Sequence, residues 1–274
     1  MQVCLNGHFI AAEQAKLSIS DGGFLFGDTL FETFKAQGQK ILLSKEHLDR
    51  LELSAKLLDF PCNRKQIELS LQQLAAQLTT PVSRIRLTIS RGDHQGLTLP
   101  APDQGWFLLT AVPYDEPSDQ ERQAGADCVL APNQRVNPLS HLPQMKRGNY
   151  ADCLYAANYA QQKGAREALF VDAGGNVLEG CTSNIFAVID DQLVTPPTGT
   201  LILAGVMRRQ ILAAANEIGL KIAEETLPLV RLRQADEIFL SNSLIEILPV
   251  NYLDGQVCKR GGRWRSLLAR VNGG

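Results

Sequence analysis

A polar segment between residues 113 and 123 constrains the fold most, because it divides the chain into two parts. The segment reads PYDEPSDQERQ and holds two prolines and four acidic residues. Such a composition is typical of a solvated linker. The chain has 274 residues, and each part is long enough to bury a core of its own. We therefore expect an N-terminal domain at residues 1–117 and a C-terminal domain at residues 118–274.

Apolar residues recur with strand and helix periods in both parts. Alternation bounded by turn signals predicts strands, and apolar residues three and four apart predict amphipathic helices. Strands are expected at residues 2–5, 9–11, 30–37, 39–43, 82–90, 105–112, 127–131, 167–172, 184–189, 237–240 and 246–250. Helices are expected at residues 44–59, 63–78, 146–163 and 205–218, the first capped by Ser44. This mixture predicts an α+β fold.

The charge balance favours a small-molecule ligand. Lys and Arg number 27 against 29 Asp and Glu, which gives a formal net charge of −2. A nearly neutral chain offers no general attraction to nucleic acid or to an anionic membrane. Five basic residues do surround Trp264 in residues 259–270. We interpret them as the solvated face of a terminal helix, with a nucleic-acid patch as the alternative.

Cysteine spacing and the first residues of the chain indicate the compartment. The six cysteines form no CxxC pair, and the four histidines are dispersed, so we expect no metal site and no disulfide framework. The opening residues MQVCLNGHFI lack the pattern of a signal peptide, and no apolar run is long enough to span a bilayer. We expect a cytoplasmic protein.

Lys146 is the first candidate for chemistry, since it is the only lysine between Lys65 and Lys163. The expected helix puts it four residues before Tyr150 on one face, followed by small and apolar positions. Desolvation on such a face lowers the pKa of a lysine, and only a neutral amine attacks a carbonyl carbon. A solvated surface lysine is the alternative interpretation.

Other candidates are one carboxylate and several groups suited to an anion. Glu179 precedes Thr182-Ser183-Asn184 near a glycine-containing turn, where it would either cap backbone amides or keep a heterocyclic nitrogen protonated. The helix expected after Gly205 begins with amides that have no partner within the helix. Arg50 adds a guanidinium, and Ser241-Asn242-Ser243 adds polar side chains after a strand.

In combination these segments resemble the class IV aminotransferase family, the fold-type IV pyridoxal-phosphate enzymes. That family includes branched-chain aminotransferases, D-amino-acid aminotransferases and aminodeoxychorismate lyases. The resemblance covers almost the whole chain, with the motifs in order. The matching segments are SDGGFLFGDTLFET (20–33), HLDRL (47–51), RLTISRG (86–92), the Lys146 segment PQMKRGNY, LEGCTSNIFAV (178–188), TPP (195–197), LAGVMRRQIL (203–212) and ADEIFLSNSLIEILPV (235–250).

The resemblance implies a fold, a cofactor and a site. It implies a small N-terminal α/β domain, a larger β-rich C-terminal domain with helices, and a homodimer. Lys146 would form the Schiff base with pyridoxal 5′-phosphate and move the substrate's α-proton. Glu179 would pair with the pyridine nitrogen and Tyr150 with the ring's phenolic oxygen. The groups expected to hold the phosphate are Arg50, the amides of Val206 and Met207, Ser243 and Asn242.

Within the family, the sequence favours aminodeoxychorismate lyase, which releases pyruvate and forms 4-aminobenzoate for folate synthesis. The chain is short for a branched-chain enzyme, LAPNQRVNPLSHLPQMK resembles the lyase's Arg-x-Asn-Pro stretch, and SNSLIEILPV resembles its Asn-small-Leu form. The motif KRGNY and the lack of a second arginine in RGDHQGLTLP favour instead a D- or branched-chain amino-acid aminotransferase. A non-catalytic binding protein is the third possibility.

The substrate's carboxylates would be held, on this interpretation, by Arg91, Arg135 and Asn242. For Arg91 a role in a tight Arg-Gly turn is an equal alternative.

Overall fold

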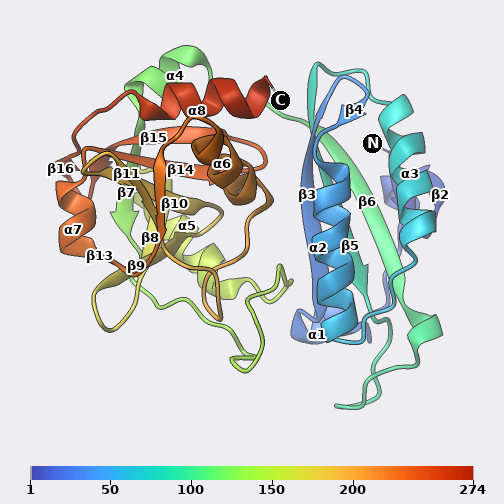
Figure 1. Ribbon diagram of the computed structural model, residues 1–274. Helices are drawn as coiled ribbons and strands as arrows, with labels where there is room; N and C mark the ends of the chain where they lie inside the picture. The colour runs from blue at the N-terminus through green and yellow to red at the C-terminus, as the bar shows by residue number, and fades with distance from the viewer. Residues whose placement is uncertain (1, 274) are drawn as a thin grey trace. The chain divides into compact units, whose positions relative to one another are not determined.

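The computed structural model describes residues 2–273, and these form two compact units (Figure 1). Unit 1 comprises residues 1–116 and 145–150, and unit 2 comprises residues 117–144 and 151–274. The junction at Glu116 and Pro117 lies beside the boundary expected near residue 118. Residues 145–150 differ from the expectation, because this segment with Lys146 packs in unit 1 rather than with the C-terminal part.

Unit 1 is built on an antiparallel sheet whose strands are ordered β2-β1-β6-β5-β3-β4. The expected hairpin at its start forms, since Asn6 and Gly7 both take the positive φ that a tight two-residue turn requires. The strands are β1 (Gln2–Leu5), β2 (His8–Ala11), β3 (Thr29–Gln37), β4 (Lys40–Ile41), β5 (Val82–Ser90) and β6 (Trp106–Pro113). Short helical turns are η1 (Ala12–Gln14), α1 (Gly22–Phe26) and η2 (Pro102–Gln104).

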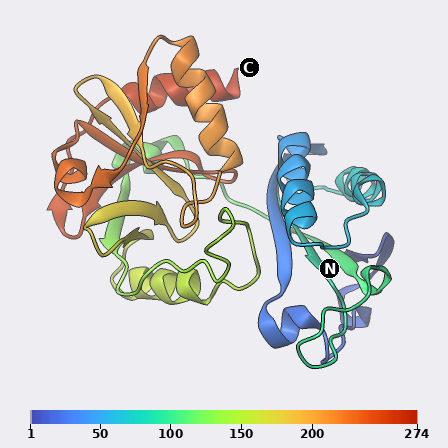
Figure 2. The ribbon, with the colours of Figure 1, turned by 60° about the horizontal axis from the view of Figure 1, so that its bottom comes forward.

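Two amphipathic helices cover one face of this sheet, α2 (Ser44–Leu57) and α3 (Arg64–Ala76) (Figure 2). They bury Leu48 and Leu51 from α2, and Ile67 from α3, against alternate residues of the sheet such as Phe34 and Leu87. Apolar side chains repeat every second residue along a strand and every 3.6 residues along a helix, so each element turns one apolar face to the shared core. Ser44 is not the cap: Leu43 occupies that position and makes no side-chain bond.

Unit 2 contains a ten-stranded mixed sheet with the order β12-β11-β10-β14-β15-β7-β8-β9-β13, and β16 pairs with β15. Its core includes Leu169, Ile185 and Leu240, all fully buried. The strands are β7 (Ala126–Leu130), β8 (Glu167–Val171), β9 (Asn176–Gly180), β10 (Asn184–Ile189), β11 (Gln192–Thr195), β12 (Lys221–Glu224), β13 (Leu227–Pro228), β14 (Glu237–Asn242), β15 (Glu246–Leu253) and β16 (Gln256–Val257).

Helices pack on both sides of the unit 2 sheet (Figure 2). The helices α6 (Val206–Glu217) and α8 (Arg263–Asn272) pack on each other and on β14 and β15, whereas α5 (Ala151–Gln162) packs on β8. Two short helices are α4 (Asp119–Ala124) and α7 (Leu229–Gln234). None of the helices within residues 2–273 is long and apolar enough to cross a membrane.

Two of the expected elements were wrong in extent. The segment taken as a linker contains α4, because Ser118 and Glu121 form a reciprocal capping box that starts a helix. The helix expected from Lys146 begins only at Ala151. The preceding residues instead bond to the edge of β3, and Gly148 disfavours a helix there. Lys146 and Tyr150 therefore do not share a helix face.

Candidate functional site

Lys146 lies in an extended segment that lengthens the sheet of unit 1 beside β3. The Phe31 amide donates to the Lys146 carbonyl at 2.9 Å, and the Gly148 amide donates to the Thr29 carbonyl at 2.8 Å. A Cβ at Gly148 would lie 1.9 Å from Thr29 Oγ1, so only glycine allows this close approach. Backbone bonds at Lys146 itself and at Gly148 thus fix where the Lys146 side chain leaves the backbone.

The ring of Phe31 brings together three polar side chains that the sequence separates widely. Lys146 Nζ lies 4.6 Å from the ring centroid, and Arg86 Cζ lies 3.9 Å from it. The Tyr150 ring meets Phe31 edge-on, with centroids 5.6 Å apart. Lys146 and Tyr150 therefore both contact the ring of Phe31, and it is this ring, not a shared helix face, that relates them. An aromatic face attracts cations, so it also orients the amine.

Arg86 is a residue that sequence reasoning missed. It projects from β5 beside Phe31, where burial lowers the pKa of its guanidinium and the nearby Tyr150 opposes this effect. An arginine inside an alternating strand, two residues from another arginine, was the available signal. Arg86 therefore places a second cation on the same ring that Lys146 contacts.

Arg50 is held by a buried carboxylate, Glu32. Arg50 Nε donates to Glu32 Oε1 at 2.7 Å, and its Nη2 donates to Oε2 at 2.5 Å. His47 Nδ1 lies 2.7 Å from Glu32 Oε2, and the side chains of His47 and Glu32 are each 1% exposed. Burial alone would raise the pKa of Glu32, but Arg50 and the hydrogen bonds outweigh it and hold this pKa at about 2. Burial keeps the pKa of His47 below its usual value.

This triad fixes the orientation of Arg50. An ionised carboxylate only accepts, so the His47 ring donates to Glu32 and leaves both carboxylate oxygens engaged. The two-pronged contact removes the rotational freedom of the guanidinium. The side chain of His47 is itself almost completely buried, which holds the whole triad in place.

Glu179 is the corresponding carboxylate of unit 2. It lies inside β9 and is 4% exposed. Its Oε1 accepts from Arg135 Nε at 3.0 Å. Its Oε2 accepts from the Leu203 amide at 3.0 Å and faces Asn184 Nδ2 at 3.5 Å. The carboxylate is thus fixed in place and charge-balanced.

Arg135 was expected to hold a substrate carboxylate, but the partners it has here are protein groups. It binds Glu179, and its Nη1 donates to Asp152 Oδ2 at 2.5 Å. Burial disfavours its charge, yet Glu179 and Asp152 outweigh burial and raise the pKa of Arg135. Asn137 of the same motif also bonds within the protein, to the Leu142 and Thr200 carbonyls. Arg135 thus links Glu179 to Asp152 within unit 2.

Arg91 is likewise engaged by protein groups. Its Nε donates to Asp28 at 2.8 Å, its Nη1 donates to the Asp59 carbonyl at 2.7 Å, and its Nη2 donates to the Leu58 carbonyl. Its guanidinium also stacks on Phe60. These contacts match the turn-stabilising alternative, since Arg91 ties the end of β5 to the end of α2.

The groups suited to an anion in unit 2 lie at two places. The helix α6 begins at Val206 with no side-chain cap on Gly205, so its first amides are not satisfied by a cap. A Cβ at Gly205 would lie 2.0 Å from Asn184 Oδ1, which makes glycine necessary there. Asn242 Oδ1 accepts from the amides of Leu244 and Ile245, both at 2.9 Å, and shapes the turn that carries Ser243.

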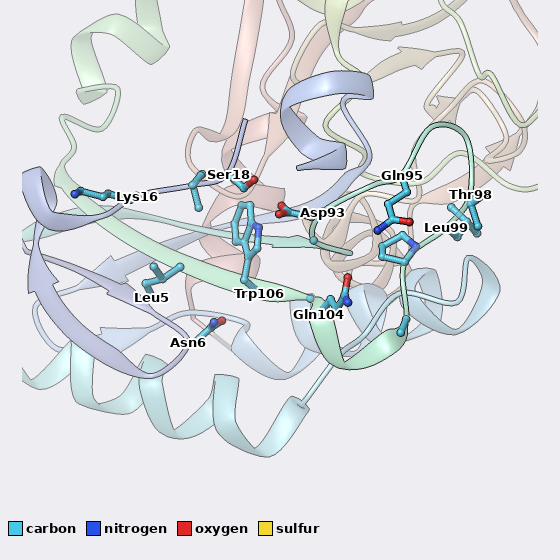
Figure 3. A pocket seen from close by; sticks show the side chains of 15 residues that line it. Leu5, Asn6, Lys16, Ser18, Asp93, Gln95, Thr98, Leu99, Gln104 and Trp106 are labelled. Atoms are coloured by element: carbon cyan, nitrogen blue, oxygen red, sulfur yellow. The ribbon is translucent and has the colours of Figure 1, made fainter. Parts of the chain in front are cut away.

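A separate hollow of about 810 Å³ lies in unit 1 and contains none of these groups (Figure 3). Trp106, Lys16 and Asp93 are among the side chains that line it. Trp106 Nε1 donates to Asp21 Oδ2 at 2.7 Å, which fastens the Asp21 turn over the sheet. The hollow is not the place where Lys146 or Arg50 acts.

A family model describes a segment that includes nearly all of these candidate residues. The model for class IV amino-transferases matches residues 29–253. The match covers most of the chain and contains Lys146, Glu179 and Arg50. The chain belongs to the class IV aminotransferase family.

Named relatives and solved structures agree on the family and differ in reaction. The chain is 35% identical over 261 residues (94% of this chain, 89% of the relative) to a Methanocaldococcus jannaschii protein provisionally named a branched-chain-amino-acid aminotransferase. It is 31% identical to a D-alanine aminotransferase of Listeria monocytogenes, over 96% of this chain and 91% of the relative.

Among solved structures, the branched-chain aminotransferase of Escherichia coli gives a TM-score of 0.91 at 27% identity, covering 99% of this chain and 93% of that one. The 4-amino-4-deoxychorismate lyase of Pseudomonas aeruginosa gives a TM-score of 0.89 at 29% identity, covering 99% and 98%. The two-domain α+β fold is therefore that of this family.

Proposed function

We propose that this chain is a pyridoxal-phosphate-dependent enzyme in which Lys146 carries the cofactor. Family membership supports this cofactor. The observation that carries the proposal is the placement of Lys146, which is fixed by backbone bonds at Lys146 and Gly148 and lies against Phe31, as Tyr150 does.

The residues of each unit fit the chemical groups of this cofactor. Unit 1 supplies a primary amine for the aldehyde, Lys146, and an oriented guanidinium for the phosphate, Arg50. Unit 2 supplies a buried carboxylate for the ring nitrogen, Glu179, and the uncapped amides of Val206 and Met207 for the phosphate. Asn242 and Ser243 are the remaining phosphate candidates, and Tyr150 is proposed for the phenolic oxygen. When bound, the cofactor supplies an electron sink for the substrate's α-carbon.

The protein's own part in the chemistry is proton transfer and charge control. Lys146, once released from the cofactor, is the base that removes the α-proton. Glu179 is paired with the Arg135 guanidinium, and we propose it as the partner of a protonated ring nitrogen. Arg86 is an added candidate for a substrate carboxylate, because its cation lies on the ring that Lys146 also covers. Asn242 stays a candidate for the same role.

For the reaction, we propose that the enzyme is a 4-amino-4-deoxychorismate lyase. Support comes from the motif SNSLIEILPV and from the lyase structure, which matches at 29% identity over 98% of its length. In this reaction Lys146 takes the α-proton, the C–O bond to the departing pyruvate breaks, and the ring becomes the aromatic ring of 4-aminobenzoate.

The second candidate is an amino-acid aminotransferase. The named sequence relatives favour it, with 35% identity to the branched-chain protein and 31% to the D-alanine enzyme. In the Arg-x-Asn-Pro stretch that favoured a lyase, Arg135 contacts Glu179 and Asn137 contacts the Leu142 carbonyl. These contacts suit either reaction.

A paired assay tests the choice. Purified enzyme is given 4-amino-4-deoxychorismate, with pyruvate and 4-aminobenzoate measured, and separately L-leucine, L-alanine or D-alanine with 2-oxoglutarate, with glutamate measured. The proposal predicts pyruvate and 4-aminobenzoate in equal amounts. Rapid glutamate formation without aminobenzoate would establish the aminotransferase instead.

We also propose a homodimer, because unit 1 exposes a cluster of large apolar side chains. Ile19 is 80% exposed, Phe24 is 74% exposed and Leu97 is 91% exposed. Their two segments are joined by the Asp21–Asp93 bridge. Exposed apolar clusters mark association surfaces. Light scattering on the eluting protein should give twice the mass of one chain, and the mass of a single chain would contradict the proposal.

A cytoplasmic location remains a further proposal. Within residues 2–273 none of the six cysteines forms a disulfide, which is compatible with a reducing compartment.

A further inference from the structure

Glu167 is a buried carboxylate that none of the roles above uses. It begins β8 and is 6% exposed. Its Oε1 accepts from the Cys181 amide at 3.1 Å. Its Oε2 accepts from Thr182 Oγ1 at 2.8 Å, from Ser183 Oγ at 3.0 Å and from the Thr182 amide at 3.4 Å. One carboxylate therefore gathers four donors from three consecutive residues.

The surrounding backbone is shaped to admit this side chain. A Cβ at Gly180 would lie 2.9 Å from Glu167 Cγ and 2.5 Å from Ser183 Oγ. Any larger residue at Gly180 would thus displace the carboxylate from the turn. All four partners donate to the two oxygens of Glu167, a set of contacts that a carboxylate can accept. Burial raises the pKa of Glu167, and the hydrogen bonds from the turn oppose this rise.

The turn that Glu167 organises, residues 181–183, connects two parts of the proposed cofactor site. Glu179 precedes it by two residues, and Asn184, which faces Glu179, follows it directly. Asn242 Nδ2 donates to the Thr182 carbonyl at 3.2 Å. Through this bond the turn contacts the segment that carries Ser243.

We infer that Glu167 is a positioning residue that sets the spacing between Glu179 and the Asn242–Ser243 turn by fixing residues 181–183. The inference rests on the proposed function, because it assigns these two parts to the ring nitrogen and the phosphate of one cofactor. Loss of the carboxylate should loosen the contact with the phosphate more than the contact with the ring. A purely structural role would weaken both together.

The test compares two ligands that differ only in the phosphate. Full-length apoprotein is titrated with pyridoxal 5′-phosphate and with pyridoxal. The dissociation constant of pyridoxal divided by that of pyridoxal 5′-phosphate measures how much the phosphate contributes to binding. Glu167→Gln removes one acceptor at nearly constant volume. We expect this ratio to fall about tenfold relative to the unaltered protein, a typical effect for a residue behind a ligand-binding group.

Asp172→Asn is the matched control, since Asp172 ends the same strand and also organises a turn. Its Oδ1 accepts from the amides of Gly174 and Asn176, both at 2.8 Å, but that turn carries no proposed cofactor residue. Its ratio should stay unchanged. Thr182→Val, which removes one donor to Glu167, is the second variant and should lower the ratio less. If Glu167→Gln does not fold, Thr182→Val provides the test of the inference.

The outcomes separate the inference from the function on which it rests. If the unaltered protein binds neither ligand, the proposed function fails. If the unaltered protein binds pyridoxal 5′-phosphate but Glu167→Gln and Thr182→Val leave the ratio as it was, the function stands and the inference is wrong. An equal fall of the ratio in Asp172→Asn would also overturn it.

Discussion

Each unit of the molecule contains a buried carboxylate paired with an arginine, but the two pairs are built in opposite senses. In unit 1 Glu32 is 1% exposed, and both of its oxygens are occupied by Arg50 and His47, while Arg50 is 15% exposed. In unit 2 the arginine is the inner support, because Arg135 lies between Glu179 and Asp152. Glu32 therefore orients the guanidinium of Arg50, and Arg135 orients the carboxylate of Glu179.

The difference shows that the same ion pair can prepare either a cation or an anion for a ligand. In each pair we take as the support the member that also binds a second titratable side chain, Glu32 with His47 and Arg135 with Asp152, and the other member as the group offered to a ligand. On this account Arg50 binds a phosphate, and Glu179 binds a protonated ring nitrogen. The predictions below test whether each pair acts in the sense described.

The largest effect is expected from Glu179→Gln. A neutral amide cannot stabilise a protonated ring nitrogen, so the rate of the chemical step should fall by roughly 10²-fold or more, as for loss of other charge-stabilising groups. The measurement is kcat with the better of the two substrate types. Glu121→Gln, at the exposed capping box of α4, is the control and should leave kcat unchanged. A Glu179→Gln enzyme with normal kcat would remove Glu179 from the site.

Glu32→Gln should be costly in a different way. Breaking a buried ion pair from one side leaves Arg50 without its counter-charge, which destabilises a fold by about 3–5 kcal/mol. Denaturant unfolding of the apoprotein should show this loss of stability. Titration should show that the variant binds pyridoxal 5′-phosphate more weakly than the parent protein does. Unchanged stability together with unchanged affinity would mean that Glu32 does not support Arg50.

The pH dependence of stability follows from the same carboxylate. The pKa of Glu32 is held at about 2, below its ordinary value of 4.5, so its stabilising contribution is fully present above pH 4.5. It is lost as pH falls toward 2. The difference in unfolding free energy between the parent and Glu32→Gln should therefore shrink between pH 5 and about pH 2, provided both still fold. A difference that grows over this range would contradict the assigned ionisation.

Arg135→Lys should have a smaller effect, of about tenfold on kcat. Lysine keeps the charge but cannot bind Glu179 and Asp152 with one planar group. If Arg135 supports Glu179, the pH profile of kcat should shift as well, whereas loss of a substrate contact would raise KM instead. A shifted pH profile of kcat would indicate that Arg135 positions Glu179, whereas a raised KM would indicate the substrate contact expected from the sequence.

Asp152→Asn should have the smallest effect, a few-fold loss in kcat. Asp152 contacts Glu179 only through Arg135, and an amide still accepts one hydrogen bond from the guanidinium. A loss larger than that of Arg135→Lys would show that Asp152 acts on the site directly.

Much of the fold was accessible from the sequence, because its signals are local. The bounds of β5 and β10 were predicted to the residue, and α3 and α6 to within two residues at each end. Apolar periodicity decides such elements. The Lys146 segment was mistaken for helix, because its structure depends on hydrogen bonds to β3, more than a hundred residues earlier.

The candidate site shows the same limit. Motif order pointed to Lys146 and Glu179, but it did not reveal what surrounds them. Phe31 lies beside Lys146 because the Lys146 segment bonds to β3, and Arg86 lies over Phe31 because β3 and β5 are paired over nine residues. The same holds for Arg135, whose partner Glu179 lies 44 positions away. Side-chain partners set by tertiary packing leave no local pattern to find.

The most direct test of the central claim is to locate the cofactor on the chain. Enzyme isolated with bound pyridoxal 5′-phosphate is treated with borohydride, digested and mapped by mass spectrometry. The account predicts loss of the yellow absorbance and a stable phosphopyridoxyl group on Lys146. Modification of another lysine instead, with Lys146 unlabelled, would contradict it.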